Sequence, residues 1–474
     1  MEKKVFYQPE GAFVGDVIPF EENGQVYLYF LLDERTMPKP GMPWALVTTN
    51  DYVHFEDHGV ALASGGTDAK DFNCYTGSVL VDSNGMHHLF YTGNNPKTTD
   101  KSGRSIQLVM HATSDDGMKT WIRHKELSFG PSEDYENFDW RDPFVFRDEE
   151  AGIWRMLLAA RNNNGPERRR GVTAQYVSGD LYSWHQEKPF WDPKRFVAME
   201  CPEVFHWGDW WYFVYSEFSD AFTTKYRMAK TLDGPWIAPE KDTIDGRAFY
   251  AAKSMFLDGK RFFTGWISTK KNAVDDGEWQ WAGAMSTLEA VQNEDGTLAF
   301  RFPEPLIQSF TEMFPITIAK KSLNAPDKYV CAMSNEMLPD QAYIRATIDI
   351  KPGTHECGLL LHSSSDGDSS YIVRLESTRS RMVFDRWPRK ATGSEQWQIS
   401  GDVPYYVELE RPCDLSAGRH TLEVIMEDSI AVIILDEQVS LSTRIYDKPR
   451  GRLGYFVSDG AIELSSLDIK QRND

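Results

Sequence analysis

The sequence predicts an all-β protein: a five-bladed β-propeller followed by a C-terminal β-sandwich. Almost no segment of the 474-residue chain has the apolar spacing of an amphipathic helix. Short runs rich in β-branched and aromatic residues are instead separated by Gly, Asp and Asn, as in strands and turns. Five of these runs resemble one another at a spacing of about 50 to 68 residues, and such a repeat is typical of a propeller.

Each repeat contains an aromatic strand that follows a glycine-bearing turn and an earlier strand-like segment. The aromatic strands are "VYLYFLL" (26–32), "HHLFYTG" (87–93), "IWRMLLAAR" (153–161), "WWYFVYS" (210–216) and "KRFFTGWIS" (260–268). The earlier segments are "GDVIPFEENG", "GSVLVDSNG", "DPFVFRDEEAG", "ECPEVFHWG" and "AAKSMFLDG". A further aromatic segment closes most units, so each repeat predicts a blade whose first strand lines the central channel.

Carboxylates stand at the same repeat position in three of the predicted first strands. Counting back eight residues from the turn glycine reaches Asp16, Glu200 and two uncharged residues in the other units. The third turn is two residues longer, and its equivalent residue is Asp142. A single acidic residue at a strand start usually belongs to a turn or cap. Three at one repeat position predict a carboxylate trio at one mouth of the channel.

The C-terminal part has a different pattern. The irregular segment "TEMFPITIAKKSLNAPDK" follows "FRFPEPLIQSF", and alternating runs such as "AYIRATIDI" and "SYIVRLES" come after it. Such alternation predicts two sheets packed face to face. Because the chain is also too long for one compact core, we expect a catalytic propeller at 1–310, a linker at 311–330 and a sandwich at 331–474.

The overall charge and the termini narrow the possible partners. The formal charge is −20, which disfavours nucleic acid and anionic membranes as partners. The dense basic run "ERRR" (167–170) is expected to be a solvated loop. The start "MEKKVFYQPEG" lacks the apolar core of a signal peptide, and no apolar run is long enough to span a bilayer. Five scattered cysteines indicate reduced thiols, so we expect a cytoplasmic protein.

Several motifs resemble those of glycoside hydrolase family 32, the β-fructosidases. "MECPEVF" (199–205) resembles the acid/base motif, "WRDPFVF" (140–146) the Arg-Asp-Pro motif, and "LFYTGN" (89–94) a strand common in the family. Segments 42–62, 74–82, 249–255 and 281–306 are also similar to family segments, and 420–446 resembles the appended β-sandwich. The resemblance therefore extends over nearly the whole chain.

This resemblance implies a retaining glycosidase that cleaves a fructofuranosyl or related furanosyl linkage. Asp16 would be the nucleophile, Glu200 the acid/base, and Asp142 a residue that stabilises charge through the ring hydroxyls. The implied substrate-binding residues are Trp44, Thr76, Ser78, Arg141 and Tyr250. We expect a small oligosaccharide or fructan-type substrate and no cofactor, because the eleven histidines lack metal-site spacing and no glycine-rich loop suits a phosphate.

The sequence departs from the family pattern around the expected sugar site. The family motif Trp-Met-Asn-Asp-Pro-Asn-Gly is "AFVGDVIPF" here, so Gly15 and Ile18 stand in place of the two asparagines. Leu31 replaces a strand glutamine, and Ala248 replaces an aspartate. These losses remove hydrogen-bonding partners for sugar hydroxyls, so we expect weak activity on sucrose and better activity on another furanoside.

Two other functional interpretations are consistent with the same carboxylate trio. One is an inverting arabinofuranosidase or xylosidase, because the neighbouring clan family shares the propeller and the trio. The other is a carbohydrate-binding propeller that has lost catalysis. The motif "MECPEVF" and the predicted sandwich favour a fructosidase, and the survival of all three acids favours an enzyme.

Overall fold

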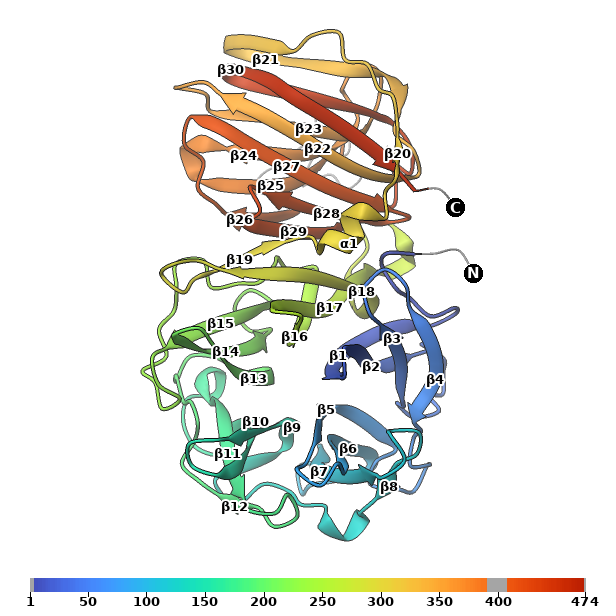
Figure 1. The fold of residues 1–474 in the computed structure, drawn as a ribbon, viewed down its shortest axis with the longest axis vertical. Helices are drawn as coiled ribbons and strands as arrows, with labels where there is room; N and C mark the ends of the chain where they lie inside the picture. Colours follow the sequence, from blue (N-terminus) through green and yellow to red (C-terminus); the bar gives the residue numbers. More distant parts are fainter. Residues whose placement is uncertain (1–3, 390–406, 473–474) are drawn as a thin grey trace.

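The computed structural model describes residues 4–389 and 407–472, and strands dominate it (Figure 1). The predicted fold class is confirmed: blades surround a central channel, and a β-sandwich follows. The first three residues of the N-terminal stretch lie outside the described residues. Within the described ranges, no helix is long and apolar enough to cross a membrane.

The propeller consists of β1 to β19. Blade I contains β1 (Phe13–Glu22), β2 (Gln25–Asp33), β3 (Trp44–Thr49) and β4 (Glu56–Leu62). Blade II contains β5 (Asn73–Val81), β6 (His87–Thr99), β7 (Ser105–Ser114) and β8 (Ile122–Arg123). Blade III contains β9 (Tyr135–Asp148), β10 (Ile153–Asn162), β11 (Gly171–Ser178) and β12 (His185–Gln186). Blade IV contains β13 (Glu200–Trp207), β14 (Trp210–Glu217) and β15 (Thr223–Ala229), and blade V contains β16 (Phe249–Leu257), β17 (Lys260–Lys270), β18 (Trp279–Gln292) and β19 (Leu298–Arg301). Short 3-10 helices are η1 (Lys125–Leu127), η2 (Glu167–Arg169) and η3 (Lys271–Ala273).

All blades are antiparallel, and their first strands β1, β5, β9, β13 and β16 surround the centre (Figure 1). One bridge, between Val14 and Gly283, joins blades I and V. The turn after each first strand contains a glycine with φ between 59° and 81°, a conformation that side chains disfavour. These glycines are Gly24, Gly85, Gly152, Gly208 and Gly259. The positive φ of these turns therefore explains why glycine recurs at this position of the repeat.

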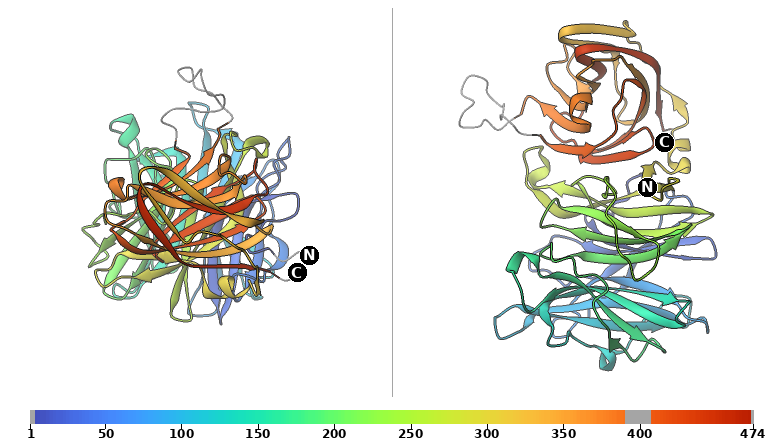
Figure 2. Two further views of the ribbon diagram at one scale, coloured as in Figure 1. Left: turned by 90° about the horizontal axis from the view of Figure 1, so that it is seen from above. Right: turned by 90° about the vertical axis from the view of Figure 1, so that its left-hand side faces the viewer.

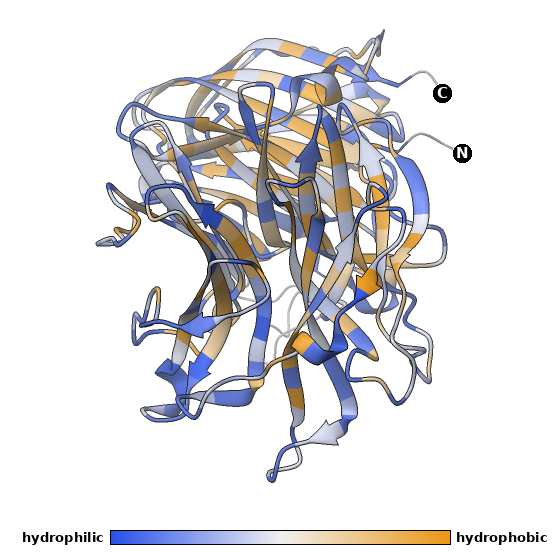
Figure 3. Ribbon diagram, turned by 60° about the horizontal axis from the view of Figure 1, so that its bottom comes forward, coloured by the Kyte–Doolittle hydropathy of each residue, from blue (hydrophilic) through white to orange (hydrophobic). Residues whose placement is uncertain are grey.

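Hydrophobic and hydrophilic residues alternate along many propeller strands (Figure 3). The apolar side chains pack between neighbouring blades, and one such cluster joins blades I and II through Tyr29, Trp44 and Tyr91. Trp44 is fully buried. The aromatic residues of the repeat thus supply much of the packing that fixes the blades.

The sandwich consists of β20 to β30, which follow the short helix α1 (Glu304–Gln308). Its strands are β20 (Glu312–Met313), β21 (Ser322–Met337), β22 (Gln341–Ile350), β23 (Glu356–Ser363), β24 (Ser370–Glu376), β25 (Arg381–Trp387), β26 (Leu409–Pro412), β27 (Gly418–Glu427), β28 (Ile430–Leu435), β29 (Val439–Arg444) and β30 (Arg452–Gln471), and η4 is Ser377–Arg379. The long strand β30 joins both layers, because its first half pairs with β23 and its second half with β22. Both β20 and β21 pair with β30, so strands occupy part of segment 311–330. The domain limits at 310 and 330 stay a prediction.

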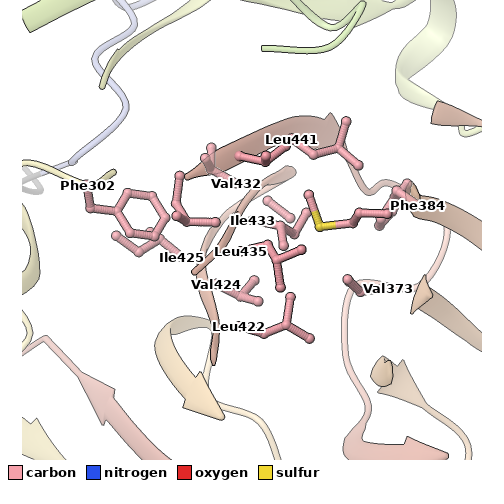
Figure 4. Close-up of a cluster of buried hydrophobic side chains, with 14 of the residues drawn as sticks. Phe302, Val373, Phe384, Leu422, Val424, Ile425, Val432, Ile433, Leu435 and Leu441 are labelled. Atoms are coloured by element: carbon pink, nitrogen blue, oxygen red, sulfur yellow. The ribbon is translucent and has the colours of Figure 1, made fainter. Parts of the chain in front are cut away.

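The sandwich packs against one side of the propeller (Figure 2). Phe302, which follows β19, lies with the sandwich residues Val424 and Leu441 in one buried cluster (Figure 4). Polar contacts also cross this interface. Asp245 accepts hydrogen bonds from the backbone and hydroxyl of Ser442 at 2.8 and 3.0 Å. The sandwich therefore supports blade V from outside the channel.

Candidate active site

The first strand of every blade departs from regular pairing at the same level of the channel. The register shifts lie between Val14 and Val17, Tyr75 and Gly77, Glu200 and Glu203, Tyr250 and Lys253, and, in blade III, opposite the step from Leu157 to Ala159. Irregularities of this kind bend a strand and redirect its side chains, and they are common next to active sites. The repeat position that carries Asp16, Asp142 and Glu200 is thus a repeated bulge.

Three of these bulges contain a residue other than glycine at positive φ. The angles are 60° at Asp142, 50° at Cys201 and 53° at Ala251. Such conformations cost about 1–3 kcal/mol each and persist only where the surrounding structure holds them. Their clustering at one level of the channel is the pattern expected of a functional site.

Asp16 is held by two hydrogen-bond donors. The hydroxyl of Thr76 donates to Oδ2 at 2.6 Å, and the indole N–H of Trp266 donates to Oδ1 at 2.9 Å. The thiol of Cys201 lies 3.7 Å from Oδ2. These contacts come from blades II, IV and V, so three blades orient one carboxylate.

Glu200 begins β13 and keeps 24% of its side chain exposed. The hydroxyl of Tyr250 donates to Oε2 at 2.6 Å, and Nη2 of Arg141 lies 3.1 Å from Oε1. The carboxylate is therefore held at both oxygens and still reaches solvent, although it stands at the start of a buried strand.

Asp142 is more deeply buried, with 3% of its side chain exposed. Its Oδ2 accepts the backbone N–H of Cys201 at 2.8 Å and lies 4.0 Å from Nε of Arg141. Its own N–H donates to the hydroxyl of Thr92 at 2.8 Å. The chain thus fixes Asp142 from blades II and IV.

Burial raises the pKa of all three carboxyl groups. The charge of Glu200 raises the pKa of Asp16 further, although hydrogen bonds from Thr76 and Trp266 oppose this shift. Arg141 lowers the pKa of Asp142 and of Glu200, but burial and the neighbouring carboxylates outweigh it. Crowded, partly desolvated carboxylates of this kind are characteristic of acid–base sites.

Two cations compensate the trio. Arg141 contacts Glu200, Asp142 and Asp139, and these carboxylates raise its pKa well above the ordinary value although burial lowers it. Lys253, only 2% exposed, donates to the carbonyl of Gly77 at 2.8 Å, and its charge lowers the pKa of Asp16 and Asp142.

Lys253 and Trp266 were not among the site residues predicted from the sequence. The signal for Lys253 was its place in "FYAAKSM", two residues beyond the bulge of blade V. The signal for Trp266 was weaker, because one tryptophan in the aromatic strand "KRFFTGWIS" gives no indication that its N–H faces Asp16.

Among the residues expected to bind sugar, Thr76, Arg141 and Tyr250 contact the trio. Ser78 does not: its hydroxyl donates to the carbonyl of Pro143 and accepts the N–H of Val145. The indole N–H of Trp44 donates to the carbonyls of residues 74 and 75, which ties blade I to blade II. Roles in sugar binding for these residues stay predictions.

The structure gives a steric reason for the glycine before Asp16. A Cβ atom on Gly15 would lie 2.4 Å from the ring of Trp281 and 3.0 Å from Cβ of Leu31. Trp281 thus occupies the space of any side chain at position 15, while its own side chain stays 38% exposed. Ile18 and Leu31 are each 1% exposed and pack with Trp44 between blades.

Within residues 4–389 and 407–472, no group of three or more His, Cys, Asp and Glu side chains is placed to hold a metal ion. The trio itself is surrounded by hydroxyl, indole, phenol and cationic groups. This arrangement can position one carboxylate against a reacting carbon and a second, protonated carboxyl against a leaving group.

Comparison with known proteins gives a consistent result. Residues 7–301 match the family model of the glycosyl hydrolases family 32 N-terminal domain. The chain is 28% identical to a sucrose-6-phosphate hydrolase of Escherichia coli over 302 residues, or 59% of this chain and 60% of that protein. It is 22% identical to a levanbiose-producing levanase of Bacillus subtilis over 485 residues, 94% and 86% of the two chains. The match thus spans less than two thirds of the Escherichia coli protein.

The fold is also similar to solved structures. An exo-inulinase from Aspergillus awamori superposes with a TM-score of 0.77 at 17% identity, covering 100% of this chain and 98% of the other. A sucrose-6-phosphate hydrolase from Lactobacillus gasseri superposes with a TM-score of 0.76 at 18% identity, covering 99% and 93%. At these identities, the likeness establishes the fold.

Proposed function

The chain belongs to glycoside hydrolase family 32, and we propose that it cleaves a fructofuranosyl linkage with retention of anomeric configuration. The observation that carries the proposal is the trio Asp16, Asp142 and Glu200, gathered from three blades at one level of the channel. Retaining glycosidases need one ionised carboxylate as nucleophile and one protonated carboxyl as acid. The surroundings of the trio favour different roles for its members.

Asp16 is proposed as the nucleophile. Two donors, Thr76 and Trp266, stabilise its charged form, and Lys253 adds a positive charge nearby. Its carboxylate would attack the anomeric carbon of the fructosyl unit as the bond to the leaving oxygen breaks. This forms a covalent fructosyl–enzyme ester.

Glu200 is proposed as the acid and then the base. Burial raises its pKa, which favours a proton on this residue. The proton would pass to the leaving oxygen in the first step. In the second step, the Glu200 carboxylate would take a proton from water as the water oxygen attacks the anomeric carbon and releases Asp16. Tyr250 and Arg141 keep the carboxyl in place for both transfers.

Asp142 is proposed to bind ring hydroxyls. Its placement by the N–H of Cys201 and the hydroxyl of Thr92 leaves little freedom to move toward an anomeric carbon. Hydrogen bonds to hydroxyls that strengthen as the oxocarbenium-like transition state forms contribute several kcal/mol in this reaction class, on the order of 10²-fold or more in rate.

The proposed substrate is a small oligosaccharide or a fructan. Relatives of the chain are named for sucrose 6-phosphate and levan, and a similar fold is that of an inulinase. Trp281 beside Gly15 places an aromatic ring where the family pattern has an asparagine, which supports a fructosyl site with fewer polar contacts. We also propose a reducing, cytoplasmic location, because all five cysteines are free thiols.

Product identification tests this proposal. The enzyme would be incubated with sucrose, inulin, levan and difructose anhydrides, and with aryl arabinofuranosides and xylosides, and the anomer released first would be followed by NMR. Release of β-fructose from one of the fructosides supports the proposal. Release of arabinose or xylose with inversion would identify the inverting alternative. Binding of a fructoside with no turnover of any substrate would identify a sugar-binding propeller.

A further inference from the structure

The basic run at 167–170 is divided by the fold. Arg168 and Arg169 are exposed, as expected of a solvated loop. Arg170 turns inward, where Nη1 lies 2.6 Å from Oε1 of Glu136, and Glu167 contacts the same guanidinium. A solvated loop was expected over the whole run, and the structure restricts it to Arg168 and Arg169. Arg170 instead joins a network of ion pairs inside blade III.

Arg161, the penultimate residue of β10, is the centre of this network. Only 3% of its side chain is exposed. Nε lies 3.0 Å from Glu136 and 3.4 Å from Asp139, and Nη2 lies 2.7 Å from Glu167. Nη1 donates to the carbonyl of Val197 at 2.8 Å. One buried guanidinium thus contacts three carboxylates and the backbone of the segment that precedes β13.

An irregularity of β9 brings two of these carboxylates together. The pairing of β9 with β10 skips residues 136–139, directly across from Arg161. In a regular strand, residues three apart point to opposite faces. Here Glu136 and Asp139 both contact Arg161, because the bulged segment redirects their side chains. The local backbone is therefore shaped around this arginine.

Arg161 is connected to the acid/base by two routes. Along the side chains, Oδ2 of Asp139 lies 3.4 Å from Arg161, and Oδ1 contacts Arg141. Arg141 in turn lies 3.1 Å from Oε1 of Glu200. Along the backbone, Arg161 holds the carbonyl of Val197, three residues before Glu200. This second contact also joins blade III to blade IV, its neighbour around the channel (Figure 1).

Charges of opposite sign alternate from the loop to the trio. Three carboxylates and three guanidinium groups precede Glu200, in the order Glu167, Arg170, Glu136, Arg161, Asp139 and Arg141. Each inner charge is shared between two neighbours, so removal of a central one leaves buried charges unpaired. Loss of Arg161 would free Asp139 and, with it, the guanidinium that holds Glu200.

We propose that Arg161 is a positioning residue that holds Glu200 in place for proton transfer. It acts on the side chain through Asp139 and Arg141, and on the backbone through Val197. The inference rests on the proposed function, because only an enzyme that protonates its leaving group depends on the position of this carboxyl. The donor must lie within hydrogen-bond reach of the leaving oxygen, and a displacement of about 1 Å can cost about 10²-fold in rate.

The test uses two fructosides that differ in their need for an acid. One is the best fructoside with a sugar as leaving group, and the other is an aryl fructoside whose leaving group needs little protonation. Arg161→Gln should lower kcat on the first by about 10- to 100-fold with KM nearly unchanged, and on the second by less than about 3-fold. General disruption of the fold would slow both alike, so equal losses on the two substrates would overturn the inference.

The pH profile of kcat/KM gives a second readout. The charged and titratable groups that face Glu200 are Arg141, Asp142, Cys201, Tyr250 and Asp16. Arg161→Gln keeps all of these and removes a nearby positive charge, so the pKa of Glu200 should rise. The basic limb of the profile should therefore move to higher pH by about half a unit or more. A basic limb that does not move would overturn the link between Arg161 and Glu200.

Two further variants guard against a simple loss of folding. Arg161→Lys keeps the charge but concentrates it on one nitrogen, whereas the contacts of Arg161 are spread over three. The basic limb should then return to its wild-type pH, while kcat stays reduced on the substrate with a sugar leaving group. If Arg161→Gln does not fold, the same comparison of substrates is made with Arg161→Lys, and equal losses again overturn the inference.

The matched control is Arg155→Gln. Arg155 lies on the same strand as Arg161 and also pairs with a carboxylate, Asp148, at 2.7 Å, but it does so at the far turn. It should change kcat by less than about 3-fold on both substrates. A leaving-group dependence in Arg155→Gln as large as that in Arg161→Gln would show that any ion pair of β10 has this effect, and would overturn the specific role of Arg161.

Glu200→Gln separates this inference from the proposed function. If Glu200 is the acid, its substitution gives the same dependence on the leaving group. Dependence in Glu200→Gln and none in Arg161→Gln would overturn the positioning role alone. No dependence in Glu200→Gln, or no turnover of any fructoside by the wild type, would contradict the proposed function and, with it, this inference.

Discussion

Strand β9 contains two buried aspartates, Asp142 near its middle and Asp148 as its last residue, and the two differ in chemistry. Asp142 lies at the level of the trio and Asp148 at the far turn, with 3% and 9% of their side chains exposed. The pKa of Asp142 is raised by burial and by the charge of Asp16. Burial also acts on Asp148, but backbone N–H groups and Arg155, whose Nε lies at 2.7 Å, lower the pKa of this residue below its ordinary value.

The difference comes from the surroundings and not from burial alone. Asp148 ends β9 and accepts an N–H from Ala151 in the following turn, and the guanidinium of Arg155 on β10 contacts the same carboxylate. At the level of the trio, Asp16, Asp142 and Glu200 share Arg141 and Lys253. The charge of Asp148 is therefore stabilised by its neighbours. The charges of the channel carboxylates are not stabilised enough to offset burial, so these groups bind protons more readily. This contrast separates a catalytic aspartate from a structural one.

The largest expected effect is that of removing the acid. Glu200→Gln should lower kcat by about 10²- to 10⁴-fold on a fructoside with a poor leaving group, because general acid catalysis is lost. The loss should be smaller on an aryl fructoside whose leaving group needs little protonation. Steady-state kinetics on both substrates checks this. An equal loss on the two substrates would argue against an acid role for Glu200.

Substitution of the two β9 aspartates should also affect activity differently. Asp142→Asn should reduce kcat/KM by about 10²-fold, because hydrogen bonds to the sugar that strengthen in the transition state are weakened. Asp148→Asn should change kcat/KM by less than about 3-fold, because its contacts are confined to the far turn. Circular dichroism of both variants controls for folding. Similar losses of kcat/KM for the two variants would show that Asp142 and Asp148 do not differ in role.

A smaller change is expected at the aromatic wall beside Asp16. Trp281→Ala should raise KM for the best fructoside by about 3- to 10-fold, because an aromatic contact contributes about 0.5–1.5 kcal/mol. Gly15→Ala should impair activity in the wild type through the clash with Trp281, and less so in combination with Trp281→Ala. Additive effects of the two substitutions would show that the residues do not share one space.

The smallest effects concern stability, and they should have opposite signs. The raised pKa of Asp142 means that its charge costs stability as pH rises above the ordinary aspartate range, near 3.9. Asp142→Asn should therefore raise Tm by about 1–3 °C at pH 7 and have little effect below pH 4. The lowered pKa of Asp148 contributes stability above that range, which is lost as pH falls through its folded value.

Asp148→Asn should accordingly lower Tm at pH 7, and the difference from wild type should shrink in acid. Thermal unfolding of the two variants between pH 3 and pH 8 measures both effects. A decrease in Tm for Asp142→Asn at pH 7 would mean that its contacts with Cys201 and Arg141 outweigh the cost of burial.

The sequence predicted the fold well because the repeat is set by local chemistry. Aromatic strands at regular spacing and glycines that must adopt positive φ fix the blade order, and the equivalent repeat position of the three acids then follows. The bulges that turn Asp142 and Cys201 toward each other leave no such signature, because ordinary residues there adopt positive φ only under tertiary constraint.

Contacts between segments that are distant in the chain could not be predicted from the sequence. Trp281 lies beside Gly15 only after blade V closes on blade I, and the contact of Arg161 with Val197 depends on the packing of blade IV on blade III. The burial of Lys253 could not be predicted, because a lysine in an apolar strand is ordinarily expected to face solvent and only the closed channel encloses it.

The most direct test of the central claim is to trap the covalent intermediate. A fluorinated fructosyl donor, whose slow second step allows the ester to accumulate, would be incubated with the enzyme and the labelled peptide identified by mass spectrometry. We predict one fructosyl adduct per chain, on Asp16, and no adduct in Asp16→Asn. An adduct on Asp142, or turnover with inversion and no adduct, would contradict the assignment of Asp16 as the nucleophile of a retaining enzyme.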